Sequence, residues 1–353
     1  MGPGLVTNVL RLRTGFEVEL LAPRGASRRS LADALASRCG GQVRPVWHHD
    51  SEPALVPRLG GRFLHLTQGF EVIRGSGEPL CTLVDDVTIV ADLDPTAAAP
   101  SGWHRLLTDD PRLLGLLARF SDPGGPLETS LDSAAALWGE RVERVGNVWR
   151  LDSAGATIAL ATPSGAERER VCEIVTPPLV ADHGAALEEL LGPARALGFT
   201  VPQEAAVHQH VDGAPFRSAS VLANVVRLFA HWREPLRHVL GTNSNCRRLA
   251  ALPDELVAAA DGTPSWDQLR DAATRGRLTK FFDVNLTQLL RDDPSRDTLE
   301  VRVHPGTISS CEVIERAAIV EGLLERCRDP ARFPAPPATI DVAIRQLRRL
   351  ATS

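Results

Sequence analysis

Short segments in which apolar and polar residues alternate occur along much of the chain and predict β-strands. The first is expected over residues 5–22, with a turn near Thr14-Gly15. Residues 43–92 contain several more, separated by Gly, Pro or Asp turns, and they predict an antiparallel sheet. The strands expected in that stretch cover residues 44–49, 62–66, 70–74, 79–84 and 87–93, and later ones cover 142–152, 156–163, 172–179, 206–213, 281–286 and 298–304. The last two are predicted to form a hairpin.

Other stretches repeat apolar residues every three or four positions, which is typical of amphipathic helices. In residues 28–39 either Ser27 or Ser30 is expected to cap the N-terminus. Residues 94–102 are expected to form a linker. Further helices are predicted over 103–140, 184–198, 217–240, 309–328 and 338–350, with helices and loops over 246–280. Strands interspersed with these helices predict the α+β class with a mainly antiparallel sheet.

The composition is typical of a globular protein. Of the 353 residues, 43% are hydrophobic and 24% are charged, and the net charge is −5. This balance gives no basic stripe for nucleic acid, and no apolar run approaches the roughly 20 residues that span a bilayer. The first residues lack the features of a signal peptide, and the six cysteines are scattered without a CxxC pair. We therefore expect a cytoplasmic protein with reduced thiols.

Ionisable side chains interrupt four of the predicted strands. In three of them two such residues are spaced two apart, so both side chains project from the same face of the strand. The residues are Glu17 and Glu19 in GFEVEL, Glu173 in CEIVTPPL, His208 and His210 in AVHQHVDG, and Glu300 and Arg302 in TLEVRVHPGT. Buried carboxylates are normally paired or bound to a metal. The pattern therefore predicts one site that binds a metal and a nucleotide.

Each motif taken alone also has a structural explanation. Glu17 and Glu19 are also typical of a solvent-exposed strand face. Glu300 and Arg302 could equally form a surface ion pair, which contributes little to stability. His208 and His210 are as consistent with two hydrogen-bonded imidazoles as with ligands. The order of the motifs along the chain favours the shared site over these separate explanations.

The order GFEVE, DDVTI, CEIVTPPL, VHQHVDG, CRRL, FFDVNL and TLEVRVHPGT resembles that of the putative amidoligase family. This family is related to glutamine synthetase and γ-glutamylcysteine synthetase, and the likeness covers residues 14–92 and 170–325. The chain departs from the family at Val87, where a small residue is usual, and in the long separation of Asp86 from Glu173. We therefore expect a single catalytic domain over residues 1–353 in which residues 94–169 form an inserted helical and strand subdomain.

The resemblance implies a glutamine-synthetase-like sheet that curves into a funnel and is flanked by helices. It also implies ATP and two or three Mg²⁺ ions as cofactors, with Mn²⁺ as an alternative because one imidazole joins the oxygen ligands. The metal ligands that it implies are Glu17, Glu19, Glu173, His208 and Glu300. The residues that it implies at the nucleotide and in catalysis are Arg302, Arg248 (or Arg247), Lys280 and His210, with Lys280 at the nucleotide only.

The activity implied by the resemblance is ATP-dependent ligation of a carboxylate to an amine through an acyl phosphate, with small molecules or peptides as substrates. No residue identifies itself as the general base, although His304 and Asp212 are polar and near the motifs. Thr307 or Ser309 is interpreted as a helix cap, and Asn285 as a residue that orients substrate or satisfies a strand end. A homo-oligomer stays open. Two other functions also stay open: a metal-dependent amidohydrolase, and a catalytically silent binding protein with this fold.

Overall fold

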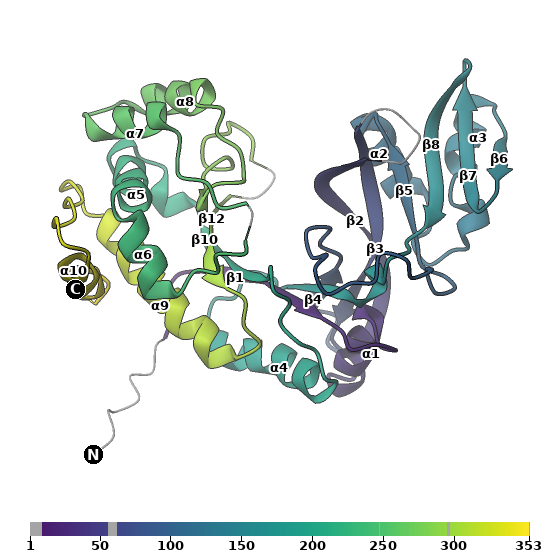
Figure 1. Cartoon of the computed structure of the whole chain (residues 1–353), viewed down its shortest axis with the longest axis horizontal. Coiled ribbons are helices and arrows are strands. Elements are labelled where there is room, and N and C mark those ends of the chain that lie inside the picture. The colour runs from purple at the N-terminus through teal and green to yellow at the C-terminus, as the bar shows by residue number, and fades with distance from the viewer. Residues whose placement is uncertain (1–8, 56–61, 247, 295–296, 353) are drawn as a thin grey trace. The chain divides into compact units, whose positions relative to one another are not determined.

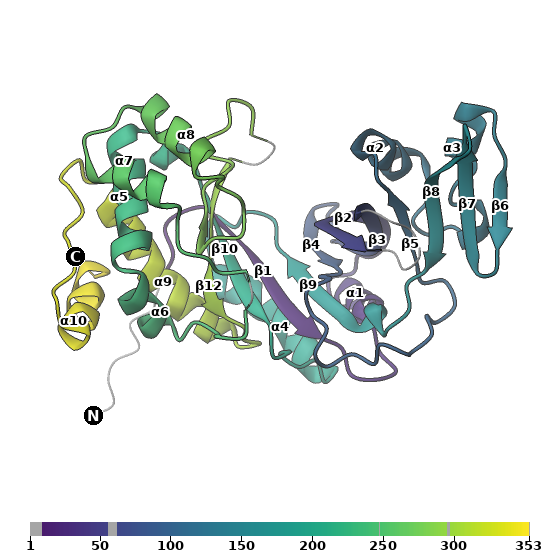
Figure 2. The ribbon, with the colours of Figure 1, turned by 45° about the horizontal axis from the view of Figure 1, so that its top comes forward.

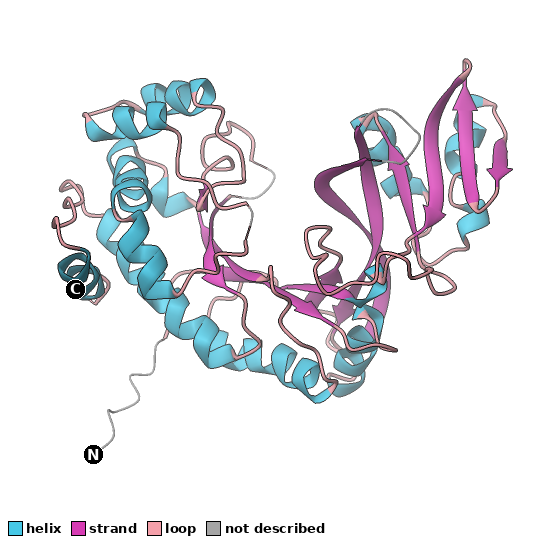
Figure 3. Cartoon of the chain, viewed as in Figure 1, coloured by secondary structure: helices cyan, strands magenta, loops and turns pink. Residues whose placement is uncertain are grey.

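The computed structural model describes residues 9–55, 62–246, 248–294 and 297–352. The chain folds into two compact units. The chain passes from one unit to the other within the strand Thr14–Leu21 and again within the helix His183–Ala196. Unit 1 contains residues 1–18, 176–192 and 204–353, and unit 2 contains residues 19–175 and 193–203. Helices and strands are mixed in both units, and the strand pairs described are antiparallel apart from one isolated parallel bridge (Figure 3). The predicted α+β class is therefore confirmed, whereas the funnel stays a prediction.

The sheet of unit 1 is formed by strands that are far apart in the sequence. Its order is β11 (Val284–Asn285), β12 (Thr298–Pro305), β10 (Ala206–Asp212) and the first half of β1 (Thr14–Leu21). The predicted hairpin of β11 and β12 is confirmed. The predicted turn at Thr14-Gly15 is wrong, because both residues pair with β10 inside the strand.

Helices α5 (Ala219–His231), α6 (Arg233–Leu240) and α9 (Ser310–Cys327) lie on one side of β10 and β12 (Figures 1 and 2). The single helix predicted over 217–240 is wrong, since α5 ends at His231 and α6 begins at Arg233. Pro235 explains the break, because it has no N–H to donate to the carbonyl four residues earlier. Unit 1 also contains α7 (Asp254–Asp261), α8 (Trp266–Arg275), α10 (Ile340–Leu350) and the short η3 (Ala214–Phe216).

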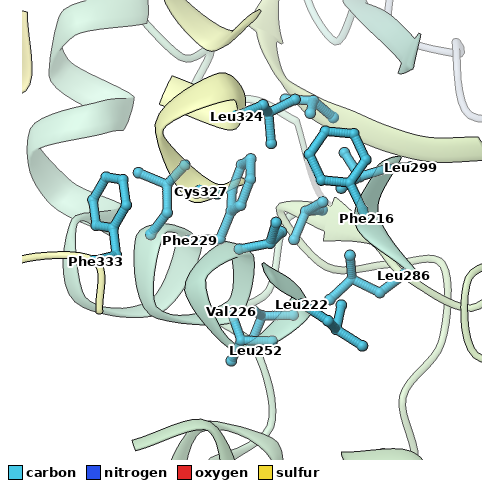
Figure 4. Packing of buried hydrophobic residues seen from close by; sticks show 14 of the residues in the cluster. Phe216, Leu222, Val226, Phe229, Leu252, Leu286, Leu299, Leu324, Cys327 and Phe333 are labelled. Atoms are coloured by element: carbon cyan, nitrogen blue, oxygen red, sulfur yellow. The ribbon is translucent and has the colours of Figure 1, made fainter. Parts of the chain in front are cut away.

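The core of unit 1 lies between this sheet and its helices. Leu222, Val226 and Phe229 of α5 pack with Leu324 of α9 and with Leu299 of β12 (Figure 4). Alternate residues of β12 belong to this core, and the residues between them therefore project from the other face of the sheet. Packing against α5 and α9 thus orients the ionisable side chains of β12.

Unit 2 contains a second set of paired strands. They follow the order β9 (Val171–Val175), β4 (Pro79–Val84), β3 (Arg62–Ile73), β5 (His104–Thr108), β8 (Ala156–Pro163), β7 (Val148–Ser153) and β6 (Val142–Val145), and β2 (Gln42–Leu55) also pairs with β3. Helices α2 (Pro111–Phe120) and α3 (Asp132–Trp138) pack on one face of β5, β8 and β7 (Figure 2). The remaining elements are α1 (Arg28–Arg38), η1 (Leu127–Thr129) and η2 (Arg168–Arg170), with α4 (His183–Ala196) crossing the boundary.

Several predictions for unit 2 are wrong. The single strand predicted over 142–152 is two strands, β6 and β7, which pair with each other across Gly146. The strands predicted at 62–66 and 70–74 are one strand, β3, because Gly69 pairs within the ladder instead of forming a turn. Residues 87–93 form turns, since the carboxylate of Asp86 accepts a hydrogen bond from the backbone of Thr88. The helix predicted from 103 begins only at α2, because residues 104–108 pair as β5. Ser27 is the N-cap of α1, as predicted.

The parts of the chain that the structure describes contain no helix that is long and apolar enough to cross a membrane. The residues predicted as an insertion, 94–169, contain β5 to β8, α2 and α3 and lie within unit 2. Their status as an insertion stays a prediction.

Candidate metal centre

Strand pairing in unit 1 brings together ionisable residues from β1, β10 and β12. Glu17 lies opposite His208 in the pairing of β1 with β10. His210, two residues further along β10, lies opposite Glu300 of β12. On the other side of β12, Asn285 of β11 lies opposite Glu300. The register thus places these side chains on one face of the sheet, away from the helical core.

The carboxylates are in contact with the imidazoles. Oε2 of Glu17 lies 3.0 Å from Nδ1 of His208, and Oε1 of Glu17 lies 3.2 Å from Nε2 of His210. Oε1 of Glu300 lies 3.7 Å from Nδ1 of His208. Each oxygen of Glu17 therefore contacts a different imidazole, and Glu300 completes a compact cluster of oxygen and nitrogen donors.

Arg302 and Asn285 donate hydrogen bonds to different oxygens of Glu300. Nη1 of Arg302 donates a hydrogen bond to Oε1 of Glu300, and Nδ2 of Asn285 donates one of 2.7 Å to Oε2. All three side chains are buried. Burial of an ion pair stabilises a protein less than apolar packing of similar volume. A site of this composition is therefore more economically explained by binding than by stability alone.

A β-bulge limits the cluster at one end. The register shifts between Gln209, which lies opposite Val301, and Val207, which lies opposite His304. Two steps along β10 thus match three steps along β12, so β12 carries an extra residue and His304 turns to the other face. There Nε2 of His304 lies 3.1 Å from Oε1 of Gln209. His304, considered from the sequence as a general base, consequently lies on the face opposite Glu300 and Arg302.

The electrostatics of the cluster favour charged carboxylates beside a neutral imidazole. Burial raises the pKa of Glu17, but the nearby His210 and the hydrogen bond with His208 outweigh this effect and hold the pKa well below its usual value. Burial also raises the pKa of Glu300, and His210 and Arg302 together lower it further than burial raises it. Burial, followed by the charge of Arg302, lowers the pKa of His208. Metal ligands require these protonation states.

The donor set fits one divalent cation. One ligand atom each from Glu17, His210 and Glu300 lies within 4.8 Å of the other two. Opposite ligands of an octahedral Mg²⁺ ion lie about 4.2 Å apart, so the three donors already approach the size of one coordination shell. When the imidazoles bind a metal they are neutral, and the two carboxylates and one guanidinium then leave a net negative charge, which the cation would neutralise. Two carboxylates with an imidazole are also compatible with Mn²⁺.

Two further basic residues predicted at the nucleotide lie on neighbouring segments of unit 1. Ala250 pairs with residues 281–283, and the carbonyl of Asp283 accepts a 3.0 Å hydrogen bond from the N–H of Arg302. The guanidinium of Arg248 and the ammonium of Lys280 lie 5.5 Å and 5.4 Å from the centroid of the same ring, Phe281. The segments that carry Arg248, Lys280 and Arg302 are therefore hydrogen-bonded neighbours.

Two other residues predicted at the site do not belong to unit 1. Glu19 follows Glu17 on β1 but belongs to unit 2, as does Glu173 of β9, and both are buried. Their assignment as metal ligands stays a prediction, and so does the division of roles between His208 and His210. Arg247, the alternative to Arg248, lies outside the described residues.

Sequence reasoning missed two residues that position the site. Asp283 is buried, and its carboxylate is held by Arg233 at 2.7 Å and Arg237 at 3.0 Å, both from α6. These ion pairs fix the position of Asp283, whose backbone carbonyl accepts the hydrogen bond from the N–H of Arg302. Phe281 was also missed as the contact that Arg248 and Lys280 share. The motif FFDVNL marked the segment but gave no role to either residue.

Comparison with known proteins adds one finding. A family model described as putative amidoligase enzyme matches residues 10–321, which include every residue of the cluster. No curated protein and no solved structure matches the chain.

Proposed function

The chain belongs to the putative amidoligase enzyme family, and from this premise we propose that it is an ATP- and Mg²⁺-dependent carboxylate–amine ligase. An oxygen of the substrate carboxylate attacks the γ-phosphorus of ATP, giving an acyl phosphate and ADP. The amine then attacks the acyl carbon, phosphate leaves, and an amide forms after the amine has lost a proton. Small molecules or peptides supply the acid and the amine.

The observation that supports this proposal best is the cluster of Glu17, His210 and Glu300 beside Arg302. Phosphoryl transfer places negative charge on oxygens that cations must stabilise, and most of its catalysis consists of positioning and charge neutralisation. Glu17, His210 and Glu300 would hold a Mg²⁺ or Mn²⁺ ion, which would supply positive charge that neutralises part of this charge.

The chain's own residues contribute orientation and permanent charge. Arg302 has five N–H donors in a planar fork and keeps its charge at all relevant pH values, which suits phosphoryl oxygens. Its hydrogen bond to Glu300 and the backbone bond to Asp283 fix its position. Arg248 and Lys280 add two positive charges around Phe281 and are proposed to contact the phosphates of ATP.

The test is ADP release by the purified full chain with ATP, Mg²⁺ and mixtures of amino acids and peptides. We expect ADP release that needs both an acid and an amine and is matched by amide formation. E300Q and R302M should lower the rate at least 100-fold, since each removes charge at the transferred phosphoryl group. E325Q and R328M are matched controls, because this ion pair is on the surface of unit 1 with 39% and 43% of the side chains exposed.

The outcomes separate the ligase from the two other functions. Amide hydrolysis that proceeds equally without ATP would identify a metal-dependent hydrolase. Unchanged turnover in both E300Q and R302M would contradict the assignment of the cluster. A protein that binds ATP but releases no ADP with any pair of substrates would be a binding protein of this family.

A further inference from the structure

A row of polar side chains crosses the strands of unit 2, remote in sequence from every residue assigned to the metal cluster. Thr67 of β3 lies opposite Arg105 of β5, and Arg105 lies opposite Thr162 of β8. His48 of β2 lies opposite Thr67 and extends the row to a fourth strand. Side chains opposite each other on antiparallel strands have Cβ atoms about 5 Å apart, so Arg105 has a threonine on each side.

The row lies on the face of the sheet that is turned away from α2 and α3. Leu66, Leu106 and Ala161, each adjacent in sequence to one residue of the row, pack into the core that α2 and α3 cover. Because side chains alternate, Thr67, Arg105 and Thr162 point to the opposite face. The next residues on that face, Leu107 and Leu160, are paired with each other and form an apolar cluster with Phe63.

Two buried polar atoms in this row form no hydrogen bond with the described residues. Oγ1 of Thr67 and Nε of Arg105 are both buried, and neither has a hydrogen-bond partner among the residues that the structure describes. Thr67 is only 3% exposed. A buried donor or acceptor without a partner costs about 1–3 kcal/mol, and such groups normally find a hydrogen-bond partner.

Arg105 also has no ion pair of its own among the described residues. The carboxylate of Asp85 pairs with Arg168, and the guanidinium of Arg28 donates to the backbone carbonyls of Gln68 and Val171. Burial lowers the pKa of Arg105, against the opposing effect of Asp85. Asp85, the carboxylate that acts on Arg105, is thus already paired with the guanidinium of Arg168.

We propose that Arg105, with Thr67 and Thr162 beside it, binds the carboxylate group of a ligand. The planar guanidinium matches a carboxylate with two parallel N–H···O hydrogen bonds, and the two hydroxyls can donate to its remaining lone pairs. Leu107 and Leu160 in the adjacent row would contact an apolar part of the same ligand. A single guanidinium with an apolar neighbour suits a singly charged carboxylate better than a phosphate dianion. This inference goes beyond the proposed function and does not depend on it.

The experiment measures binding of N-acetylglycine and of inorganic phosphate to the full chain by calorimetry and ligand-observed NMR. ATP, amine and metal are left out, so the result is independent of ligase activity. We expect R105M to weaken N-acetylglycine binding at least tenfold and R105K to weaken it less, because lysine keeps the charge without the fork. R112M is the matched control, since Arg112 also belongs to unit 2 but its side chain is 90% exposed.

Thermal unfolding separates a binding role from a structural one. If Arg105 and Thr67 are retained for a ligand, R105M and T67V should raise the Tm of the ligand-free protein, because each removes an unmet buried donor. N-acetylglycine should raise the Tm of the wild type and not that of R105M. Unchanged affinity in R105M, tighter binding of phosphate than of N-acetylglycine, or binding of neither probe by the wild type would each overturn the proposal.

Discussion

The side-chain amide of Asn285 donates a 2.7 Å hydrogen bond to the carboxylate of Glu300, its cross-strand neighbour on β12. The other oxygen of that carboxylate accepts a hydrogen bond from Arg302. Oδ1 of Asn285 in turn accepts hydrogen bonds from the backbone N–H and the hydroxyl of Thr287, which fix the orientation of the amide. Asn285 therefore positions Glu300 for the cluster without itself offering a strong metal ligand.

Substitution of Asn285 is expected to weaken catalysis through Glu300. N285A should lower kcat/KM by about 10- to 100-fold and raise the Mg²⁺ concentration needed for half-maximal activity, as is usual when a partner of a metal ligand is removed. Steady-state kinetics over a range of Mg²⁺ concentrations measure both effects. N245A, a change at an exposed asparagine of the same unit, should leave both unchanged. An unaltered Mg²⁺ dependence in N285A would mean that Asn285 does not support a metal ligand.

Divalent cations are expected to stabilise the folded protein before any substrate is added. The carboxylates of Glu17 and Glu300 share one partly buried space, and a cation that binds the folded state alone stabilises it by about 2.7 kcal/mol at 100 times its Kd. Tm measured by calorimetry should rise with Mg²⁺ or Mn²⁺ and fall again with EDTA. E17Q and E300Q should lose this response, whereas E325Q should keep it. An identical Tm with and without cations would contradict the metal centre.

Much of the fold was predictable where alternation is strong and local. The strands at β8 and β10 and the capped helix α1 follow directly from apolar periodicity and from Ser27. Residues 104–108 were missed because HRLLT continues without a break into helical spacing, and only pairing with β3 and β8 identifies it as a strand. Long-range pairing of this kind overrides local propensity.

The residues of the cluster formed by Glu17, His210 and Glu300 could be singled out from the sequence, but the contacts between them could not. Spacing by two places His208 with His210, and Glu300 with Arg302, on common faces. The same rule applied to Arg302 and His304 fails, because the bulge opposite His208 reverses the side chain of His304. No glycine marks this bulge in TLEVRVHP. Register across β1, β10 and β12 depends on tertiary packing, so the contacts of Glu17 could not be derived from the sequence.

His304 is expected to make the stability of the protein depend on acidic pH. It is 3% exposed, and burial, with a contribution from Arg316, lowers its pKa from 6.5 to about 3. Between these pH values the unfolded chain binds the proton and the folded chain does not, so protonation favours unfolding. The free energy of unfolding should therefore fall as the pH decreases from 6.5 toward 3, by up to roughly 1.4 kcal/mol per pH unit from this residue.

Denaturant unfolding at a series of pH values measures this contribution. H304Q cannot titrate, and its stability should decrease less steeply below pH 6.5 than that of the wild type. H238Q, a change at an exposed histidine of α6, is the matched control. Parallel curves for the wild type and H304Q would show that His304 is protonated equally in both states.

Phe281 is expected to affect nucleotide binding through the two cations that share its ring. Arg248 and Lys280 lie 5.5 Å and 5.4 Å from the ring centroid, and each cation–π contact contributes about 0.5–1 kcal/mol. Since 1.4 kcal/mol corresponds to a factor of ten, F281A should raise the KM for ATP by about 5- to 30-fold, with a smaller change in kcat. F281Y should remain close to the wild type. F120A removes a comparable contact with Arg119 in unit 2, at 5.3 Å, and should leave the KM unchanged. Equal KM values for F281A and F120A would show that the two cations do not bind ATP in an arrangement set by Phe281.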